Sequence, residues 1–310
     1  MLSVITVTYN SVTEIPEFIS SLESQQVAWQ LWLVDNASHD ETPELLRSLS
    51  TANSQIRAVL NTTNVGLAAA NNQPLADLHS RYTAIINPDV VLHAGALGKL
   101  ASYLDDHANV VAVAPVNVDE DGTPHSSFHR GWGLRHLLVW RLLPGRLTKW
   151  LYSRVRRYDE QDVLFASGAC ILMRTADLRG IGGYDPQYFL TVEDVCDLCI
   201  RLRCGDSNKR VVVYPGARIT HLKSRSAVAV PYVTLWYGAY GSIYHFNKHH
   251  GTAAGLAAFL IVALSTSLRA VAAAVRAPFD ARYRTSLTNN CRVLVRLFTD
   301  NPVFQQNKQP

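Results

Sequence analysis

Short apolar runs alternate with amphipathic stretches over the first 120 residues of the chain. Strands that are buried on both faces read as continuous apolar segments, so we expect these runs to form β-strands. The predicted strands are Ser3–Tyr9, Leu31–Asp35, Ile56–Asn61, Tyr82–Asn87 and Val110–Val118. Helix-compatible stretches lie between them, at Ile15–Gln25, Pro43–Leu49, Gly66–Leu78 and Ala94–His107. This alternation predicts an α/β fold, in which helices cover both faces of a largely parallel sheet.

The rest of the chain divides into three sections of different composition. Residues 125–160 are basic and aromatic, with a Pro144-Gly145 break. Residues 164–221 return to alternation, with strands expected at Phe165–Met173, Arg210–Tyr214 and Arg218–His221 and a helix at Glu193–Arg203. From about Pro231 the chain is Ala-rich and helix-compatible. We therefore expect one domain over residues 1–225, which includes 125–160 as an insertion, and a helical extension over 226–310.

The positive charge of the chain is concentrated in one section. The 310 residues carry a net charge of +4, yet Arg130–Arg157 alone holds eight Lys/Arg and no Asp/Glu. A local excess predicts a local anionic partner and argues against general coating of nucleic acid. The hydrophobic share of 48% is enough for a sizeable core.

The cysteines indicate a reducing environment. There are five, an odd number, and Met1 leads directly into a predicted strand, so we expect a cytosolic protein. Cys196 and Cys199 lie three residues apart on a predicted helix, but no second Cys/His pair follows at zinc-finger spacing. We therefore interpret them as packing thiols.

Polar residues gather at the ends of the predicted strands. In open α/β sheets the ligand lies beyond the carboxyl ends of the strands, so we expect a site there. Asn87-Pro88-Asp89 ends an apolar strand. Its carboxylate suits Mg²⁺ or Mn²⁺ held jointly with substrate phosphates, although the same tripeptide also suits an ordinary turn. Asp35 could accept hydrogen bonds from a base or a ribose, or belong to a helix cap with Ser38.

Two later patterns carry further candidate chemistry. Glu193-Asp194 opens a predicted helix, where the macrodipole favours carboxylates and where a buried carboxylate would serve as a general base. His221 ends a strand and is either a satisfied histidine or a contact to a metal or phosphate near Asp89. The chain contains no G-x-G-x-x-G and no P-loop motif, which argues against dinucleotide oxidoreductases and P-loop enzymes.

The order and spacing of seven short motifs give the chain a family resemblance. It resembles family 2 glycosyltransferases with the GT-A fold over roughly residues 2–225, and within them the bacterial rhamnosyltransferase-like branch. The resemblance implies a Rossmann-like, mostly parallel sheet flanked by helices and followed by the helical extension. The motifs are Val4–Asn10, Val34–Ser38, Asn64–Asn72, Asn87–Asp89, Ser167–Cys170, Gly182–Asp185 and Glu193-Asp194.

The resemblance also implies a role for each site residue. Asp194, supported by Glu193, would be the base that deprotonates the acceptor hydroxyl. Asp89 and His221 would hold a divalent cation, Mg²⁺ or Mn²⁺. The nucleotide would lie against Thr8, Tyr9, Asn10, Asp35, Asn64, Gly66, Asn71 and Asn87. The sugar and acceptor would lie against Gly168, Ala169 and Asp185.

The chain departs from the family pattern in two places. Asn87 stands where the metal-binding D-x-D motif has its first Asp, so one carboxylate is missing. One residue is also extra between Asp194 and Asp197, where the branch usually reads E-D-x-D-L-C. Either the helix begins one residue later, or Asp197 is rotated by about 100° from the expected face. Among Glu193, Asp194 and Asp197, we take Asp194 as the base.

The basic section predicts a membrane surface as a partner. We expect it to contact anionic lipid through Arg130, Trp132, Arg135, Trp140, Arg141 and Trp150, because basic aromatic segments lie in membrane interfaces. A solvated basic face and a single-stranded nucleic-acid site are the alternatives, and the acidic crevice argues against nucleic acid. Gly251–Leu268 has no charged residue. Its many small residues favour a helix that is buried or interfacial over one that spans the membrane. We expect this helix and the basic section to dock the protein on the cytoplasmic leaflet.

These observations predict an inverting glycosyltransferase in bacterial cell-surface polysaccharide synthesis, such as O-antigen assembly. The donor would be a dTDP-, UDP- or GDP-linked sugar, and the branch suggests a deoxysugar such as rhamnose. The acceptor would be a growing glycan or a polyprenyl-pyrophosphate-linked sugar, met on the cytoplasmic face of the cell membrane. The missing carboxylate and the extra residue after Val195 keep open the alternative of a non-catalytic sugar-nucleotide-binding or scaffold protein. A third hypothesis is a basic membrane adaptor without nucleotide affinity.

Overall fold

The chain forms two compact units. The computed structural model describes residues 1–124, 128–129, 131–143, 147, 160–222 and 231–303. The first unit comprises Met1–Arg130 and Val155–Ser226, and the second comprises Gly131–Arg154 and Ala227–Pro310. Part of the 125–160 section is thus grouped with the C-terminal helices.

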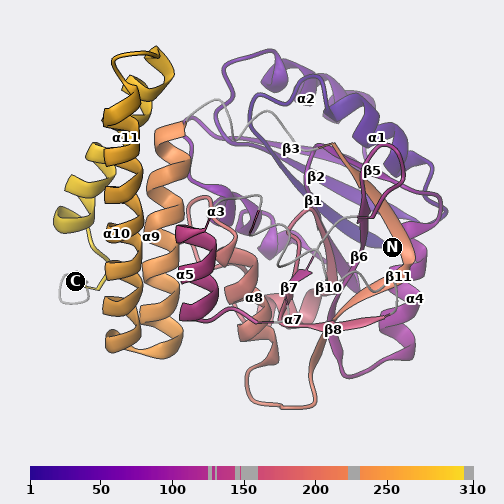
Figure 1. Cartoon of the computed structure of the whole chain (residues 1–310). Coiled ribbons are helices and arrows are strands. Elements are labelled where there is room, and N and C mark those ends of the chain that lie inside the picture. Colours follow the sequence, from indigo (N-terminus) through magenta and orange to yellow (C-terminus); the bar gives the residue numbers. More distant parts are fainter. Residues whose placement is uncertain (125–127, 130, 144–146, 148–159, 223–230, 304–310) are drawn as a thin grey trace. The chain divides into compact units, whose positions relative to one another are not determined.

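The first unit is built on a mixed sheet with the strand order β3-β2-β1-β4-β10-β6-β11-β5, and β8 also pairs with β11 (Figure 1). The four strands from β3 to β4 are parallel, as is the β6–β11 pair, whereas β10, β5 and β8 run antiparallel to their neighbours. The strands are β1 (Leu2–Thr8), β2 (Trp29–Asp35), β3 (Ile56–Leu60), β4 (Tyr82–Ile86), β5 (Val90–Leu92), β6 (Val110–Val118), β8 (Gln161–Val163), β10 (Cys170–Arg174) and β11 (Arg210–His221). A separate small sheet pairs β7 (Phe128–His129) with β9 (Phe165–Ala166).

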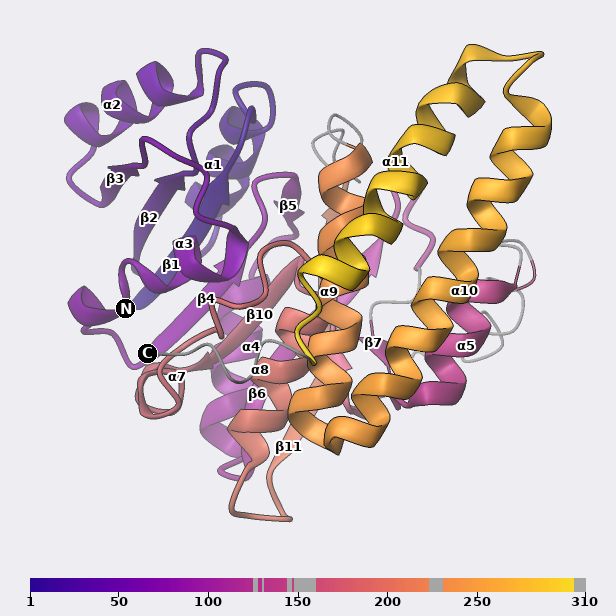
Figure 2. The same cartoon turned by 90° about the vertical axis from the view of Figure 1, so that its left-hand side faces the viewer.

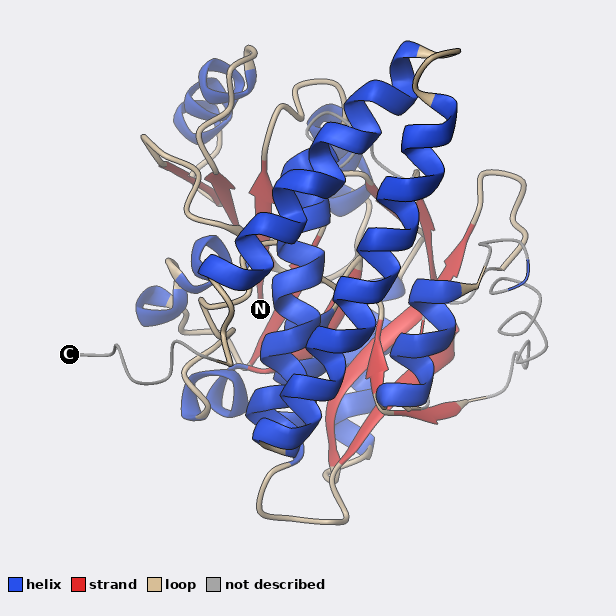
Figure 3. Ribbon diagram, turned by 60° about the vertical axis from the view of Figure 1, so that its left-hand side comes forward, coloured by secondary structure: helices blue, strands red, loops and turns tan. Residues whose placement is uncertain are grey.

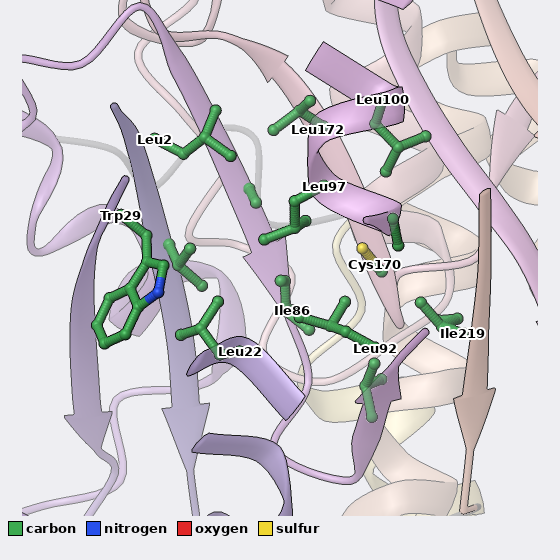
Figure 4. Close-up of a cluster of buried hydrophobic side chains, with 14 of the residues drawn as sticks. Leu2, Leu22, Trp29, Ile86, Leu92, Leu97, Leu100, Cys170, Leu172 and Ile219 are labelled. Atoms are coloured by element: carbon green, nitrogen blue, oxygen red, sulfur yellow. The ribbon is translucent and has the colours of Figure 1, made fainter. Parts of the chain in front are cut away.

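Amphipathic helices cover the sheet. In α1 the buried positions include Ile15, Phe18 and Leu22, a spacing that places apolar side chains on one face. These side chains share one core with α4 and with strands β1 to β6, β10 and β11 (Figure 4). The helices of this unit are α1 (Ile15–Glu23), α2 (Thr42–Ala52), α3 (Leu67–Asn72), the short 3₁₀ helix η1 (Leu75–Asp77), α4 (Ala96–Asp106), α7 (Thr175–Gly180) and α8 (Glu193–Arg203).

The structure differs from the predicted elements at several breaks. The strand expected at Phe165–Met173 is divided into β9 and β10, because Ser167–Ala169 leave the strand conformation. The helix expected at Gly66–Leu78 ends at Asn72, two residues before Pro74, which cannot continue a helix. The two strands expected between 210 and 221 form one strand, β11, with a register shift between Tyr214 and Arg218.

All secondary-structure elements in the described part of the second unit are helices (Figure 3). Its helices are α5 (Leu134–Leu142), α9 (Pro231–His250), α10 (Thr252–Arg276) and α11 (Ala281–Thr299). Helices α9, α10 and α11 lie side by side and pack against one another (Figure 2). Arg292 and Arg296 of α11 lie over the rings of Tyr232 and Trp236 on α9, at 4.0 and 4.3 Å from the ring centroids. Among the described residues, α10 is the one helix that is long and apolar enough to cross a membrane.

Candidate active site

The carboxyl ends of β1 and β2 are tied together by hydrogen bonds to Asp35. Thr8 and Asp35 are register partners, and the Thr8 hydroxyl donates to Asp35 Oδ1 at 3.2 Å. The hydroxyl and backbone N–H of Ser38 donate to the same carboxylate at 2.5 and 3.0 Å. The backbone N–H of Asn10 then donates to the Ser38 hydroxyl at 2.8 Å. Asp35 therefore organises this loop, and its predicted contact with a base stays a prediction.

A second set of amide contacts holds the loop that precedes α3. Asn36 Nδ2 donates to Asn64 Oδ1 at 2.9 Å, and Asn36 Oδ1 accepts from the Val65 N–H at 2.9 Å. Gly66 has φ of +87°, and a Cβ atom there would lie 2.7 Å from the Phe189 ring. Only glycine suits that position. Asn36 is a loop-positioning residue for which the sequence alone predicted no role.

Asp89 and His221 meet where β4, β5 and β11 come together. The Leu222 N–H donates to the backbone carbonyl of Asp89 at 3.0 Å, which fixes the end of β11. His221 Nε2 then lies 3.3 Å from Asp89 Oδ2, and Asp89 is buried. The structure thus brings together the two residues that we predicted as a metal pair.

A cavity of about 310 Å³ lies at these strand ends. Six of the predicted site residues line it, namely Asn71, Asn87, Gly168, Ala169, Asp194 and His221. The other predicted residues of this unit lie outside its lining, and they are Thr8, Tyr9, Asn10, Asp35, Asn64, Gly66, Asp89, Asp185 and Glu193. A hollow of about 650 Å³ lies along α4 but contains no strand-end carboxylate or amide, so the smaller cavity is the better candidate.

Asp194 is the carboxylate of α8 that reaches the cavity. Its side chain is buried, and its residue is 1% exposed. The pKa of Asp194 is raised to about 8, mainly by burial and in addition by the nearby charges of Glu193 and Asp197, while the hydrogen bond from the Val195 N–H lowers it. Asp197 is ion-paired with Arg201 at 2.7 Å on the same helix and does not line the cavity. Among the three carboxylates, Asp194 therefore has the position and the pKa that suit proton transfer near neutral pH.

Three buried polar atoms of the cavity lining have no hydrogen-bond partner within the described structure. They are Asp194 Oδ2, Asn71 Oδ1 and Thr191 Oγ1. Leaving a buried polar atom unpaired costs about 1–3 kcal/mol, so these atoms are suited to bind hydroxyl groups of a ligand. Thr191 was not predicted from the sequence, because nothing in its local pattern marks it as part of a site.

Tyr184 lines the cavity and is anchored to α3. Asn72 Nδ2 donates to the Tyr184 carbonyl at 2.7 Å, and the Tyr184 N–H donates to Asn72 Oδ1 at 2.8 Å. Gly182 and Gly183 precede it with φ of +74° and +75°. A Cβ atom on Gly183 would lie 2.3 Å from Asn72 Oδ1, whereas one on Gly182 would meet nothing within 4 Å.

The Gly183→Ala variant is expected to be much less stable than the Gly182→Ala variant. The left-handed backbone alone makes alanine unfavourable by about 1–2 kcal/mol at either position. At Gly183 the collision with Asn72 adds to this, so we expect a total of about 3 kcal/mol or more. Urea unfolding of the two variants measures the difference directly. Equal losses of stability would show that the contact with Asn72 is unimportant.

The predicted membrane-surface residues have different environments. Arg130 and Trp150 lie outside the described residues. Trp132 packs against the core of the second unit, and Arg141 donates to the Gly238 carbonyl at 2.5 Å. Of the predicted set, Arg135 and Trp140 are exposed.

Comparison with solved structures identifies the fold of the chain. The mannosyltransferase PcManGT from Pyrobaculum calidifontis, solved with GDP-Man and Mn²⁺, aligns with a TM-score of 0.57 at 17% identity, covering 99% of this chain and 88% of that one. TarS 1-349 from S. aureus in complex with UDP-GlcNAc aligns with a TM-score of 0.52 at 15% identity, covering 97% and 92%. The fold is that of GT-A glycosyltransferases, as predicted.

Sequence comparison completes the identification. The family model described as Glycosyl transferase family 2 matches residues 3–182, so the chain belongs to glycosyl transferase family 2. An N-acetylglucosaminyl-diphospho-decaprenol L-rhamnosyltransferase from Mycobacterium tuberculosis is 27% identical over 243 residues, covering 73% of this chain and 77% of that protein. The predicted family, branch and enzyme class are confirmed, and the chain is a glycosyltransferase.

Proposed function

We propose that the chain transfers a sugar, with inversion, from a nucleoside diphosphate to a glycan or lipid-linked acceptor in cell-surface polysaccharide synthesis, with Asp194 as the base. The observation that carries this proposal is the unpaired Oδ2 atom of Asp194, which lies in the lining of the same cavity as Asn87 and His221. A base for acceptor activation and groups for a diphosphate are thus available around one hollow.

The residues of the cavity have different roles in a single nucleophilic displacement at the anomeric carbon. Asp194 Oδ2 accepts the proton of the acceptor hydroxyl, and the acceptor oxygen attacks the anomeric carbon as the bond to the diphosphate breaks. Attack opposite the leaving group inverts the configuration at that carbon. Asn71 Oδ1 and Thr191 Oγ1 bind and orient sugar hydroxyls, which places the reacting atoms in line. Burial of the cavity walls strengthens each of these interactions.

Asp89 and His221 would hold a divalent cation. A carboxylate and an imidazole 3.3 Å apart are both suitable donors for Mn²⁺. No group of three such donors occurs among the described residues, so oxygen atoms of the diphosphate would complete the coordination. When bound, the cation supplies positive charge that stabilises the leaving diphosphate. The Mn²⁺ present in the PcManGT structure supports the same class of cofactor.

The relatives support a particular donor and acceptor. The name of the mycobacterial relative describes transfer of L-rhamnose to a sugar carried on diphospho-decaprenol. We infer that this chain uses an activated deoxyhexose, such as dTDP-rhamnose, and a polyprenyl-diphosphate-linked acceptor. Such an acceptor is held in a bilayer, so the enzyme works as a peripheral protein on the cytoplasmic face of the cell membrane.

A donor panel tests the proposal. Purified protein is incubated with dTDP-rhamnose, UDP-GlcNAc and GDP-mannose, each with Mn²⁺ and a polyprenyl-diphosphate-linked N-acetylglucosamine, and release of nucleoside diphosphate is measured. We expect acceptor-dependent release with one donor. Binding of a donor without turnover by any pair would instead favour the non-catalytic sugar-nucleotide-binding protein.

Activity is expected to rise with pH through about 8. Only the ionised form of Asp194 accepts a proton, and its pKa in the folded protein is about 8. Below that value kcat/KM falls about tenfold for each pH unit, and above it kcat/KM levels off. A profile measured between about pH 6 and pH 9.5 with saturating cation checks this. A flat profile over that range would exclude Asp194 as the titrating base.

A further inference from the structure

Helix α10 has mostly small side chains on its packed face and large apolar side chains on its exposed face. Of the buried residues on the face that packs against the rest of the second unit, Phe259 and Val262 are large and the other six are small or weakly polar, namely Gly255, Ala258, Ser265, Thr266, Ala270 and Ala273. The opposite face carries six large aliphatic side chains. These residues, called the outer stripe below, are Leu256, Leu260, Leu264, Leu268, Val271 and Val275. Their spacing of three or four residues places them along one side of the helix.

The outer stripe is exposed along its whole length. Its side chains are 38–69% exposed, and Phe279, at the turn after the helix, is 89% exposed. Helices α5, α9 and α11 all pack on α10, yet they leave this side uncovered. A helix in water has its large apolar residues turned inward. Small residues inward and leucines outward are the arrangement of helices whose surroundings are lipid.

The charge of the second unit indicates which lipid surface fits. The second unit, residues 131–154 and 227–310, holds 13 Lys/Arg and 2 Asp/Glu. The rest of the chain holds 16 Lys/Arg and 23 Asp/Glu. The turn that exposes Phe279 is flanked by Arg276, Arg282 and Arg284, with Asp280 as its one acidic residue. Basic residues beside an apolar strip are attracted to anionic headgroups by about 1 kcal/mol each.

We propose that the outer stripe of α10, together with Phe279, is the surface by which this chain binds an anionic phospholipid bilayer. The helix lies along the interface and does not span it. Its other sides are covered by α9 and α11, which carry Lys248, Arg292 and Arg296, and these charges cannot enter the hydrocarbon core. The inference deepens the proposed function, since a lipid-linked acceptor requires an enzyme at the membrane surface.

The proposal gives the main role in docking to α10 and not to the basic section. The sequence predicted docking through both, with named contact residues on and near α5, of which Trp140 is exposed and Trp132 packs inward. In the structure, α5 offers Leu138 and Trp140 as exposed large apolar side chains, whereas α10 offers an unbroken stripe. Burial of apolar area determines the strength of interfacial binding, so the stripe contributes more than α5 does.

Vesicle flotation with matched variants of the full chain tests the proposal. The stripe variant carries Leu260→Gln, Leu264→Gln and Val271→Gln, and the α5 variant carries Leu138→Gln and Trp140→Gln. All five positions are exposed, so both variants should fold. Vesicles of phosphatidylcholine with and without phosphatidylglycerol are compared at low salt. We expect the stripe variant to bind the anionic vesicles at least about tenfold more weakly than the unmodified protein, and the α5 variant to stay within about twofold.

Several results would overturn the proposal. They are a stripe variant that floats like the unmodified protein, an unmodified protein that does not float with anionic vesicles, and a greater loss in the α5 variant. Light scattering without vesicles tests whether the stripe instead binds a second copy of the chain. If the unmodified protein is a dimer and the stripe variant is a monomer, the stripe is a contact between two copies and the proposal is wrong.

Transfer to a short, water-soluble acceptor separates this proposal from the proposed function. The stripe variant should retain that transfer, because no stripe residue belongs to the cavity lining. A protein that floats but transfers nothing would contradict the enzyme function and leave the docking surface intact. A protein that transfers to the soluble acceptor but never floats would contradict the docking surface and leave the enzyme function intact.

Discussion

The Asp194→Asn variant is expected to lose about 10²–10⁴-fold in kcat while it still binds the donor. Asparagine keeps the size of the side chain but cannot accept a proton from the acceptor hydroxyl. The cavity lining is otherwise unchanged, so the dissociation constant for the nucleoside diphosphate should stay within a few-fold of that of the unmodified protein. Steady-state kinetics and calorimetric titration with the nucleotide measure the two quantities separately.

Two controls accompany this variant. Glu193→Gln removes the neighbouring carboxylate, which does not line the cavity, and should cost much less activity.

The second control is the thermal stability of the Asp194→Asn variant as a function of pH. The pKa of Asp194 is about 8 when folded against an ordinary value of 3.8, so its ionisation destabilises the fold increasingly as the pH rises from about 4 to 8. Asp194→Asn should therefore unfold at a higher temperature than the unmodified protein at about pH 9, and this advantage should shrink toward acid pH. An active Asp194→Asn enzyme would refute the base assignment.

The Asp89→Asn variant is expected to lose about 10²–10³-fold in kcat. Asp89 is the buried carboxylate beside His221, with Oδ2 and Nε2 3.3 Å apart. Without its charge, a divalent cation is no longer held at that end of the cavity. The negative charge that develops on the leaving diphosphate then has no counterpart. Kinetics with Mn²⁺ titrated at saturating donor should show both a lower kcat and a higher Mn²⁺ requirement.

Asp105→Asn is the matched control for this prediction. Asp105 is also ion-paired, with Arg81 at 2.7 Å, but it is partly exposed and lies outside the cavity lining. Its removal should leave kcat and the Mn²⁺ requirement unchanged, since exposed ion pairs contribute about 1 kcal/mol or less. Equal effects of the two substitutions would mean that Asp89 acts through general stability and has no specific role.

The first half of the fold could be predicted because its strands are buried on both faces. Ser3–Tyr9 and Val110–Val118 read as apolar runs, and β1 and β6 occupy nearly the same residues. β5 was missed because its three residues, Val90–Leu92, give too short a pattern and directly follow a turn. Its position depends on antiparallel pairing with β11, a contact about 130 residues away along the chain, which local sequence does not encode.

The site residues could be predicted where an ionisable side chain lies at the end of a predicted strand or in a recognisable motif. Asp89 and Asp194 belong to motifs and His221 ends a predicted strand, and the structure brings them around one hollow or next to it. Thr191 belongs to no motif, and the motif Val34–Ser38 gave Asn36 no role of its own, because the roles of both residues depend on which atoms remain unpaired or meet after folding. The outer stripe of α10 was also hidden, since an apolar helix reads alike whether its leucines face inward or outward.

The anchoring of Tyr184 by Asn72 has a mechanical consequence for the cavity. One side-chain amide holds both backbone groups of a residue 112 positions away, as an adjacent β-strand would. The two bonds involve the same side-chain amide, so a rotation of that amide would break both, and together they hold the Tyr184 side of the cavity to α3. We therefore expect any widening of the cavity for a bulky acceptor to occur away from Tyr184, whose side remains a fixed template.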